Sequence, residues 1–555
     1  QELGLFRMSD MPEKAPETDS SAAAETAIDN ETQGPSNTMD DETAALCPMG
    51  IKLALITISL MLAVLCVALD NTIIAVAIPH ITDQFHNLND VGWYASAYLL
   101  TTCALQLLFG KLYALFSVKI VFLSALFVFE LGSLICGIAP TSTALIVGRA
   151  IAGLGSAGIF TGALVTIAHT VAREKRPMFF GLLGGMYGIA SVAGPLMGGA
   201  FTDHATWRWC FYINLPLGGV TAVVILLILK LPPKPASKRG SFLQVLKRLD
   251  PIGTAVFIPS IICLLLALQW GGVKYQWSNA RIIILFAMFG VLLIGFVTIQ
   301  LIMKDDATVP PRIAGNRTIA SAALFGFCIG GSFFILTYYI PIWFQVIKNT
   351  SAVRSGIYSL PMILANVVGI VGAGSLTTKL GHYAPFFIAS AVIMSIGAGL
   401  ITTFTVHTAQ SKWVGYLFIY GFGVGLGFQQ GGVAAQAVLP LKDVSIGTAM
   451  VMFVQMLGGA LFVSVAQNLF TNQLVKNLMA LGIPNLHPEV IVHAGATSLR
   501  SMIDPEALPQ VLTAYNAALV KTFELALIMS CLSILGALGI KWKSVKGKEL
   551  APGGA

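Results

Sequence analysis

Charged residues are scarce in this chain. Only 11% of its 555 residues are Asp, Glu, Lys or Arg, whereas 56% are hydrophobic. A soluble protein of this length carries about 25% charged residues on average. The composition therefore excludes soluble enzymes, and the formal net charge of +7 is too small and too scattered for a nucleic-acid-binding surface.

Patterns that carry catalysis or metal binding are also missing. The eight cysteines form no Cys-x-x-Cys pair, and no Gly-x-x-x-x-Gly-Lys-[Ser/Thr] phosphate loop occurs. No Ser/His/Asp or metal-spaced His/Cys group stands out either. We therefore expect no enzyme activity, no cofactor, no metal site and no ATP-driven pumping.

What the chain has instead is a series of long apolar stretches. Each covers about 20 residues or more, enough for a helix to cross ~30 Å of hydrocarbon. Fourteen are predicted, at 53–78, 92–113, 120–139, 142–167, 178–201, 210–230, 251–270, 281–303, 318–344, 356–377, 384–405, 413–435, 447–469 and 519–540. The predicted fold class is an all-α membrane protein with fourteen transmembrane helices.

An internal repeat divides these helices into two sets. Gly92, Tyr94, Gly110 and Leu112 recur 264 residues later as Gly356, Tyr358, Gly374 and Leu376. We therefore predict two pseudo-symmetric six-helix halves with two helices inserted between them. The predicted organisation is a disordered tail at 1–50, a first half at 51–230, a linker at 231–250, inserted helices at 251–303, a linker at 304–317, a second half at 318–540 with a long outer loop at 470–518, and a tail at 541–555.

The loops differ in their basic residues. Those on the side of the two termini hold 21 Lys and Arg, against 8 on the opposite side. Loops rich in Lys and Arg stay in the cytoplasm, so both termini are predicted to be cytoplasmic.

Three charged residues fall inside predicted spans of the first half. A carboxylate at mid-membrane, such as Asp70, costs about 2.5–3.5 kcal/mol, so it must face water, pair with a cation or be protonated for part of a cycle. Arg149 cannot give up its proton and raises the same question. Opposite charges at Asp70 and Arg149 within one six-helix half indicate a polar functional network. Glu130 belongs either to this network or to the membrane interface.

Small and amide residues distinguish other spans. Gly181, Gly184, Gly185, Gly188, Gly194, Gly198 and Gly199 leave one face of span 5 nearly smooth, and Pro195 bends it. Such a helix can rock against a neighbour or simply pack tightly. In the second half, neutral residues replace the charges, and these either bind a bulky amphipathic substrate or bond neighbouring helices. The candidate binding residues are Tyr338, Asn366, Gln429, Gln430, Gln436, Phe453 and Gln455.

Four segments of the sequence form short motifs. They are residues 69–72 with 77–79 in span 1, Leu145, Arg149, Gly153 and Gly155 in span 4, the run 181–199 in span 5, and residues 207–216 at the entry to span 6. Together these segments resemble the fourteen-span drug:proton antiporters of the major facilitator superfamily, in its span 1 signature, its span 4 motif, its span 5 antiporter motif and its entry to span 6.

One loop departs from the family pattern. After Gly110-Lys111-Leu112-Tyr113, which looks like a fungal variant of the loop between spans 2 and 3, Ala114 stands where the superfamily has Asp. Ala190 and Ala152 also replace a motif glycine and a motif glutamine. The sequence therefore predicts no acidic gate at this loop.

The resemblance implies proton-coupled export of drugs, toxins or secondary metabolites, with Gly110, Lys111, Gly194, Pro195, Gly198 and Gly199 in conformational motifs. Asp70 is expected to respond to protons and Arg149 to modulate it. The expected partners are a small organic substrate, protons and the lipid bilayer, for a monomer in the plasma membrane or, alternatively, the vacuolar membrane. Import of a siderophore-like solute, or a transporter-like sensor, are the alternative functions.

Overall fold

The computed structural model describes residues 50–85, 90–231, 248–272, 274–482 and 503–546. The predicted tail at 1–50 therefore lies almost wholly outside the described residues, as do residues 547–555 of the second predicted tail and most of the predicted linker at 231–250. Every regular element in the described part is helical. This agrees with a chain whose solvent is lipid, because a helix satisfies its own backbone hydrogen bonds.

The first half contains six helical segments that cross the bundle. They are α3 (Ile51–Phe85), α4 (Val91–Leu115), α5 (Val118–Ile138), α6 (Ser142–Thr170), α7 (Arg176–His204) and the pair α8 (Trp209–Tyr212) and α9 (Asn214–Ile228). They pack mainly against one another, and α6 lies at the centre of this half.

The second half repeats this order. Its helices are α14 (Arg317–Val346), the pair α15 (Ala352–Tyr358) and α16 (Leu360–Leu380), α17 (Ala384–Ile401), the pair α18 (Gln410–Phe428) and α19 (Gln430–Val438), α20 (Val444–Ala480) and α23 (Leu508–Gly539). The halves contact each other where α4 meets α20 and where α7 meets α16.

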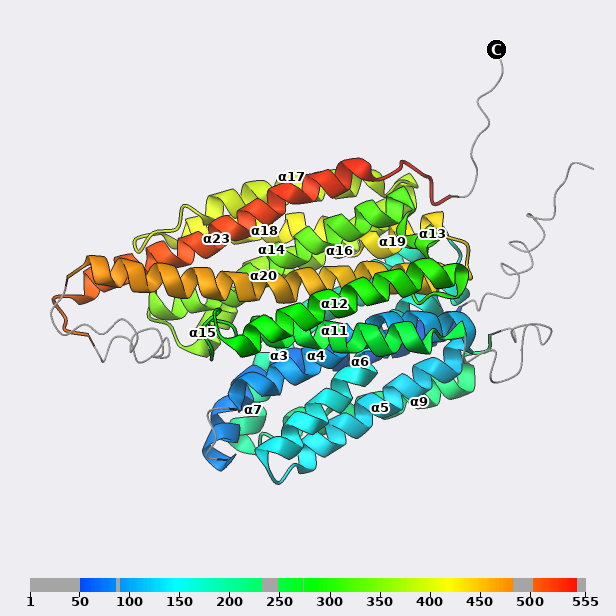
Figure 1. Cartoon of the computed structure of the whole chain (residues 1–555), viewed down its shortest axis with the longest axis horizontal. Helices are drawn as coiled ribbons and strands as arrows, with labels where there is room; N and C mark the ends of the chain where they lie inside the picture. Colours follow the sequence, from blue (N-terminus) through cyan, green and yellow to red (C-terminus); the bar gives the residue numbers. More distant parts are fainter. Residues whose placement is uncertain (1–49, 86–89, 232–247, 273, 483–502, 547–555) are drawn as a thin grey trace, which may run out of the picture. The chain divides into compact units, whose positions relative to one another are not determined.

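Two further helices, α11 (Pro251–Trp270) and α12 (Ala280–Met303), separate the halves in the sequence. They pack on each other, and α11 also contacts α4 of the first half and α20 of the second (Figure 1). A short 3₁₀ helix, η2 (Lys304–Asp306), and α13 (Pro311–Ala314) then lead into α14.

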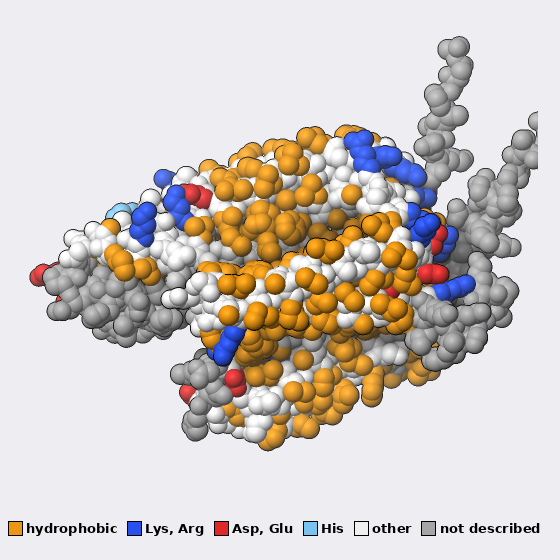
Figure 2. Space-filling view, viewed as in Figure 1, with side chains coloured by type: hydrophobic (Ala, Val, Ile, Leu, Met, Phe, Trp, Pro, Cys, Tyr) orange, Lys and Arg blue, Asp and Glu red, His pale blue; other side chains and the backbone are white. Residues whose placement is uncertain are grey.

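Thirteen helices in the described residues are long and apolar enough to cross a membrane. The remaining predicted segment, 413–435, forms α18 and α19, which break at Gln429. Figure 2 shows the apolar side chains that such helices present to lipid as a broad orange band, with the blue and red side chains gathered toward its two ends.

We call the side on which α3 begins and α23 ends the terminal face. It carries the turn between α6 and α7, and the start of α20.

The outer loop predicted at 470–518 is shorter than expected. Helix α20 continues to Ala480 and α23 begins at Leu508. Hydropathy detects only the lipid-buried part of a helix, and α20 with 37 residues is about 55 Å long. Its polar last turns are held by packing of Leu474 and Leu478 and by a 3.0 Å hydrogen bond from Asn477 Nδ2 to the Ala514 carbonyl.

Candidate functional site

Asp70 and Arg149 meet in the centre of the first half. The guanidinium of Arg149, on α6, forms an ion pair with the carboxylate of Asp70, on α3. The Arg149 side chain is 1% exposed and the Asp70 side chain is 0% exposed. An unpaired charge at this depth is very costly, so each residue supplies the partner that the other requires.

Neighbouring groups complete this ion pair. Arg149 Nε donates to the Tyr94 carbonyl at 2.7 Å, and its guanidinium carbon lies 4.4 Å from the centre of the Tyr98 ring, a cation–π contact. Asn214 Nδ2, at the start of α9, donates to Asp70 Oδ1 at 3.4 Å and to Ser133 Oγ at 3.2 Å. The site therefore joins α3, α4, α5, α6 and α9.

Glu130 lies on α5, close to the same site. Both of its carboxylate oxygens are buried, with no hydrogen-bond partner among the described residues. Its carboxyl group occupies the space beside Gly218 of α9, where a Cβ atom would collide with it. The carboxyl group of Glu130 is thus enclosed between α5 and α9.

The glycine face of α7 lies against the second half. A Cβ atom on Gly181 would lie 3.0 Å from the Ile370 carbonyl of α16, and one on Gly184 would lie 2.9 Å from Gln429 Cγ. Gly188 faces the Val367 side chain still more closely. The smooth face therefore forms a close contact between the two halves.

The end of this motif faces the first half instead. Gly194 packs against Thr72 of α3, and the Thr72 hydroxyl donates to the Ala190 carbonyl at 3.0 Å. Pro195 lies inside α7, one residue beyond this contact. Gly199 has no atom within 4 Å of its would-be Cβ, so it has no role in close packing here.

The residues of the loop motif lie on the terminal face. A Cβ atom on Gly110 would lie 2.6 Å from the Cβ of Ala449 on α20, so this glycine allows α4 and α20 to meet. Lys111 is only 4% exposed. Its Nζ donates to the carbonyls of Asp306 and Ala307, at 3.1 and 2.6 Å.

Four of the predicted binding residues surround the break between α18 and α19. We call Asn366, Gln429, Gln430 and Gln455 the amide cluster. Gln429 sits at the break and reaches Gly184 of α7, and Gln455 Nε2 on α20 lies 3.5 Å from the carbonyl of Phe428, the last residue of α18. The side-chain oxygens of Asn366, Gln429 and Gln430 are buried, with no hydrogen-bond partner in the described part of the chain.

The other three candidates lie elsewhere. Phe453 packs edge to face on Phe257 of α11, in an apolar cluster with α4. Gln436 is on the terminal face, where its Nε2 donates to the Leu164 carbonyl of α6 at 3.2 Å. Tyr338 is 52% exposed although most of α14 is buried, so its ring remains accessible.

Sequence reasoning missed the residues that support these sites. Asn214 was noted only within a family motif, and Tyr98 carried no signal because an aromatic residue in a membrane helix is ordinary. A buried network in the second half, Ser332 with Tyr420 and Ser530 at 2.8 Å each, was also missed. Ser and Tyr fit any apolar helix, so only the fold brings these three together.

Comparison with known proteins identifies the family to which this chain belongs. A family model described as Major Facilitator Superfamily matches residues 60–463, about three quarters of the chain. The chain belongs to the major facilitator superfamily. It is 67% identical to "Efflux pump aflT" of Aspergillus parasiticus over 497 residues, covering 90% of this chain and 97% of that protein.

Two other relatives of this superfamily member bear similar names. "MFS-type efflux pump MFS1" of Trichophyton rubrum is 59% identical over 506 residues, covering 91% of this chain and 94% of that protein. "Efflux pump roqT" of Penicillium rubens is 51% identical over 491 residues, covering 88% and 91%.

Solved structures confirm the fold. The human organic anion transporter MFSD10 (TETRAN) aligns with a TM-score of 0.56 at 12% identity, covering 87% of this chain and all of that one. The proton:xylose symporter XylE aligns with a TM-score of 0.54 at 14% identity, covering 88% and 98%. The predicted fold class is therefore confirmed. The family resemblance of the sequence is confirmed by the family model and by the relatives named above.

Proposed function

We propose that this superfamily member exports bulky amphipathic organic compounds in exchange for protons, by alternating access of its two halves. The observation that carries the proposal is the buried ion pair of Asp70 and Arg149. It places a group that can take up a proton beside one that cannot lose its own. The efflux pumps named above, at 51–67% identity, support the direction of transport.

Protonation of Asp70 is the proposed coupling step. A neutral carboxyl loses most of its attraction to Arg149, which keeps its bond to the Tyr94 carbonyl and its contact with Tyr98. The ion pair that ties α3 to α6 then weakens, and the helices of the first half can rearrange. Proton release restores the pair and completes the cycle.

The energy of one proton is sufficient for this cycle. Movement through ~100 mV releases about 2.3 kcal/mol, and each pH unit adds about 1.4 kcal/mol. A hundred-fold uphill gradient of a neutral compound requires only about 2.7 kcal/mol. One proton per transported molecule therefore drives substantial accumulation.

Glu130 is proposed as a second proton-binding residue of this site. Its unpartnered, buried oxygens favour the neutral carboxylic acid, because a bare carboxylate there would be neither solvated nor paired. Its position on α5, against α9, places it beside the helix that carries Asn214. A proton held by Glu130 can thus be exchanged within the same half that contains Asp70.

The amide cluster and Tyr338 are proposed to bind the substrate. Buried amide oxygens without partners can accept hydrogen bonds from hydroxyl or amino groups of an organic molecule. The exposed ring of Tyr338 offers an apolar face with a polar tip. Gln429 reaches α7, so a molecule bound here would contact both halves.

The terminal face is proposed to be the cytoplasmic one, in a plasma membrane. The support is the excess of Lys and Arg in the loops of this side. The protein is proposed to act as a monomer, since each half already contains the groups that it uses.

The test uses vesicles with an imposed pH gradient. Asp70→Asn keeps the shape of the side chain but cannot ionise, and we expect it to lose gradient-driven flux while exchange without a gradient persists. Asp83→Asn is the matched control, because Asp83 is an exposed carboxylate on the same helix. Full gradient-driven flux in Asp70→Asn would reject the coupling role.

The direction of transport is tested separately in cells. A strain that lacks the protein should retain more of a toxic organic compound than its parent, and restoring the intact chain should reverse this. Depletion of the compound in the deletion strain would instead indicate import.

A further inference from the structure

The segment between α12 and α14 is a structured clip. Its anchor is Asp250, the fully buried N-cap of α11. The Asp250 carboxylate accepts hydrogen bonds from Gln300 Nε2 at 2.7 Å and from the Thr308 backbone N and Oγ1 at 3.0 and 2.9 Å. Gln300 Oε1 in turn accepts from the Val309 amide at 2.8 Å. These bonds fix residues 304–316 against the ends of the inserted helices.

The clip is attached to the first half through Lys111. The Lys111 ammonium is buried and donates to two successive carbonyls of the clip, those of Asp306 and Ala307. A buried ammonium without such partners would be costly, so separation of α4 from the clip must expose Lys111 to water or supply other acceptors.

The clip is attached to the second half through Arg312. Its guanidinium makes two hydrogen bonds to Asp443, the N-cap of α20, at 2.6 and 2.9 Å. A third, at 2.6 Å, goes to Asp305 of the clip itself. Bidentate pairing fixes direction as well as distance, and these carboxylates raise the pKa of Arg312 above its usual range.

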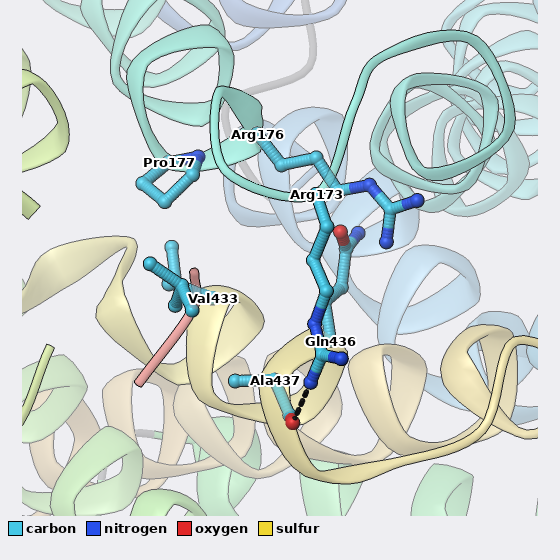
Figure 3. Close-up of a pocket in the computed structure, with 7 residues that line it drawn as sticks. Arg173, Arg176, Pro177, Val433, Gln436 and Ala437 are labelled. Atoms are coloured by element: carbon cyan, nitrogen blue, oxygen red, sulfur yellow. Dashed lines mark hydrogen bonds between the residues drawn. The ribbon is translucent and has the colours of Figure 1, made fainter. Parts of the chain in front are cut away.

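Direct contacts between the halves lie on the same face. Beside the clip, Gly110 of α4 touches Ala449 of α20. Near the α6–α7 turn, Arg173 donates to the Ala437 carbonyl at the end of α19, next to Gln436, which bonds Leu164 (Figure 3). Opening of the terminal face must separate α4 from α20, and thus the two attachment points of the clip.

We propose that the clip, residues 304–316, acts as a latch that holds the terminal face closed. Its two attachment points are Lys111 of the first half and Asp443 of the second, and each of these is called a catch of the latch. The inserted helices then have a mechanical role, since they anchor the latch through Asp250 and Gln300. One catch must release whenever α4 and α20 part. The latch requires only that the halves separate at this face, and it does not depend on the proton coupling proposed above.

The test measures a distance rather than transport. Spin labels at Glu174→Cys in the first half and Lys379→Cys in the second report the separation of the halves on the terminal face, since both residues are exposed and neither touches the latch. Cys47 and Cys531 are replaced by serine, and pulsed electron resonance is recorded in lipid nanodiscs.

We expect Arg312→Gln and Asp443→Asn each to raise the ratio of separated to joined molecules roughly three- to ten-fold, because each removes a charge-assisted pair that is partly exposed. The double variant should do no more than Arg312→Gln alone, since that change already removes both bonds between Arg312 and Asp443. Arg312→Lys, which keeps the charge but loses the bidentate geometry, should give a smaller shift. Lys111→Met releases the other catch and should also favour separation.

Lys521→Gln is the matched control, because it breaks an exposed ion pair within α23 alone. Folding is checked by elution volume. The proposal is overturned if folded Arg312→Gln and Asp443→Asn give the parent's distances, or if their effects add in the double variant.

Discussion

The two halves place different chemistry on equivalent helices. In the first half, the first, fourth and sixth helices meet through Asp70, Arg149 and Asn214. In the second half, the same three helices, α14, α18 and α23, meet through the hydroxyls of Ser332, Tyr420 and Ser530. Both networks are buried and both join the same set of helices, but only the first carries charge.

This difference allows the contribution of such a network to stability to be distinguished from a role in proton coupling. The second half has the same helical architecture with neutral hydroxyls at this contact and no ion pair. A buried ion pair is costly and is often no more stabilising than apolar packing. This contrast fits the proposal that the charges of the first half exchange protons, and the following predictions test it.

Removal of Arg149 should have the largest effect. Arg149→Met leaves the Asp70 carboxylate buried without its partner, which we expect to cost about 3–5 kcal/mol of stability. The midpoint of thermal unfolding in detergent measures the loss. The double variant Asp70→Leu with Arg149→Met should recover most of it while remaining inactive in gradient-driven transport. A double variant no more stable than Arg149→Met would show that the pair is not the source of the cost.

Glu130 should affect coupling more than stability. Glu130→Gln removes a proton-binding group but keeps its size, and we expect gradient-driven flux to fall about five-fold, equivalent to roughly 1 kcal/mol. The unfolding midpoint should stay constant or rise, because the unpartnered carboxyl group at position 130 is replaced by a neutral amide. Glu524→Gln, at an exposed site on α23, is the control. An unchanged flux in Glu130→Gln would restrict proton exchange to Asp70.

The neutral network should show the smallest effect. Tyr420→Phe removes one hydrogen bond to Ser332, which keeps its contact with Ser530, and should cost about 1 kcal/mol. The transport rate should depend on the size of the pH gradient in the same way as in the parent protein. Loss of that dependence would mean that the second half also takes part in coupling, and the contrast between the halves would fail.

The sequence predicted the membrane helices well because hydropathy and helix length are local properties. It also identified Asp70 and Arg149, since charges in lipid are rare and costly. It could not pair them, because residues 79 positions apart meet only through the packing of α3 on α6. Nor could it separate Gln429 from Gln436. Both are amides in apolar surroundings, and only the break at Gln429 shows that one lies beside α7 and the other on the terminal face.

The interrupted fourth helix of the second half has a consequence for inhibition. Because α19 is only nine residues long and is separated from α18 at Gln429, it contacts the first half at both ends, through Gln429 beside Gly184 of α7 and through the Ala437 carbonyl, which accepts a hydrogen bond from Arg173. A compound bound at the break is therefore expected to inhibit transport if the two halves must separate along α19.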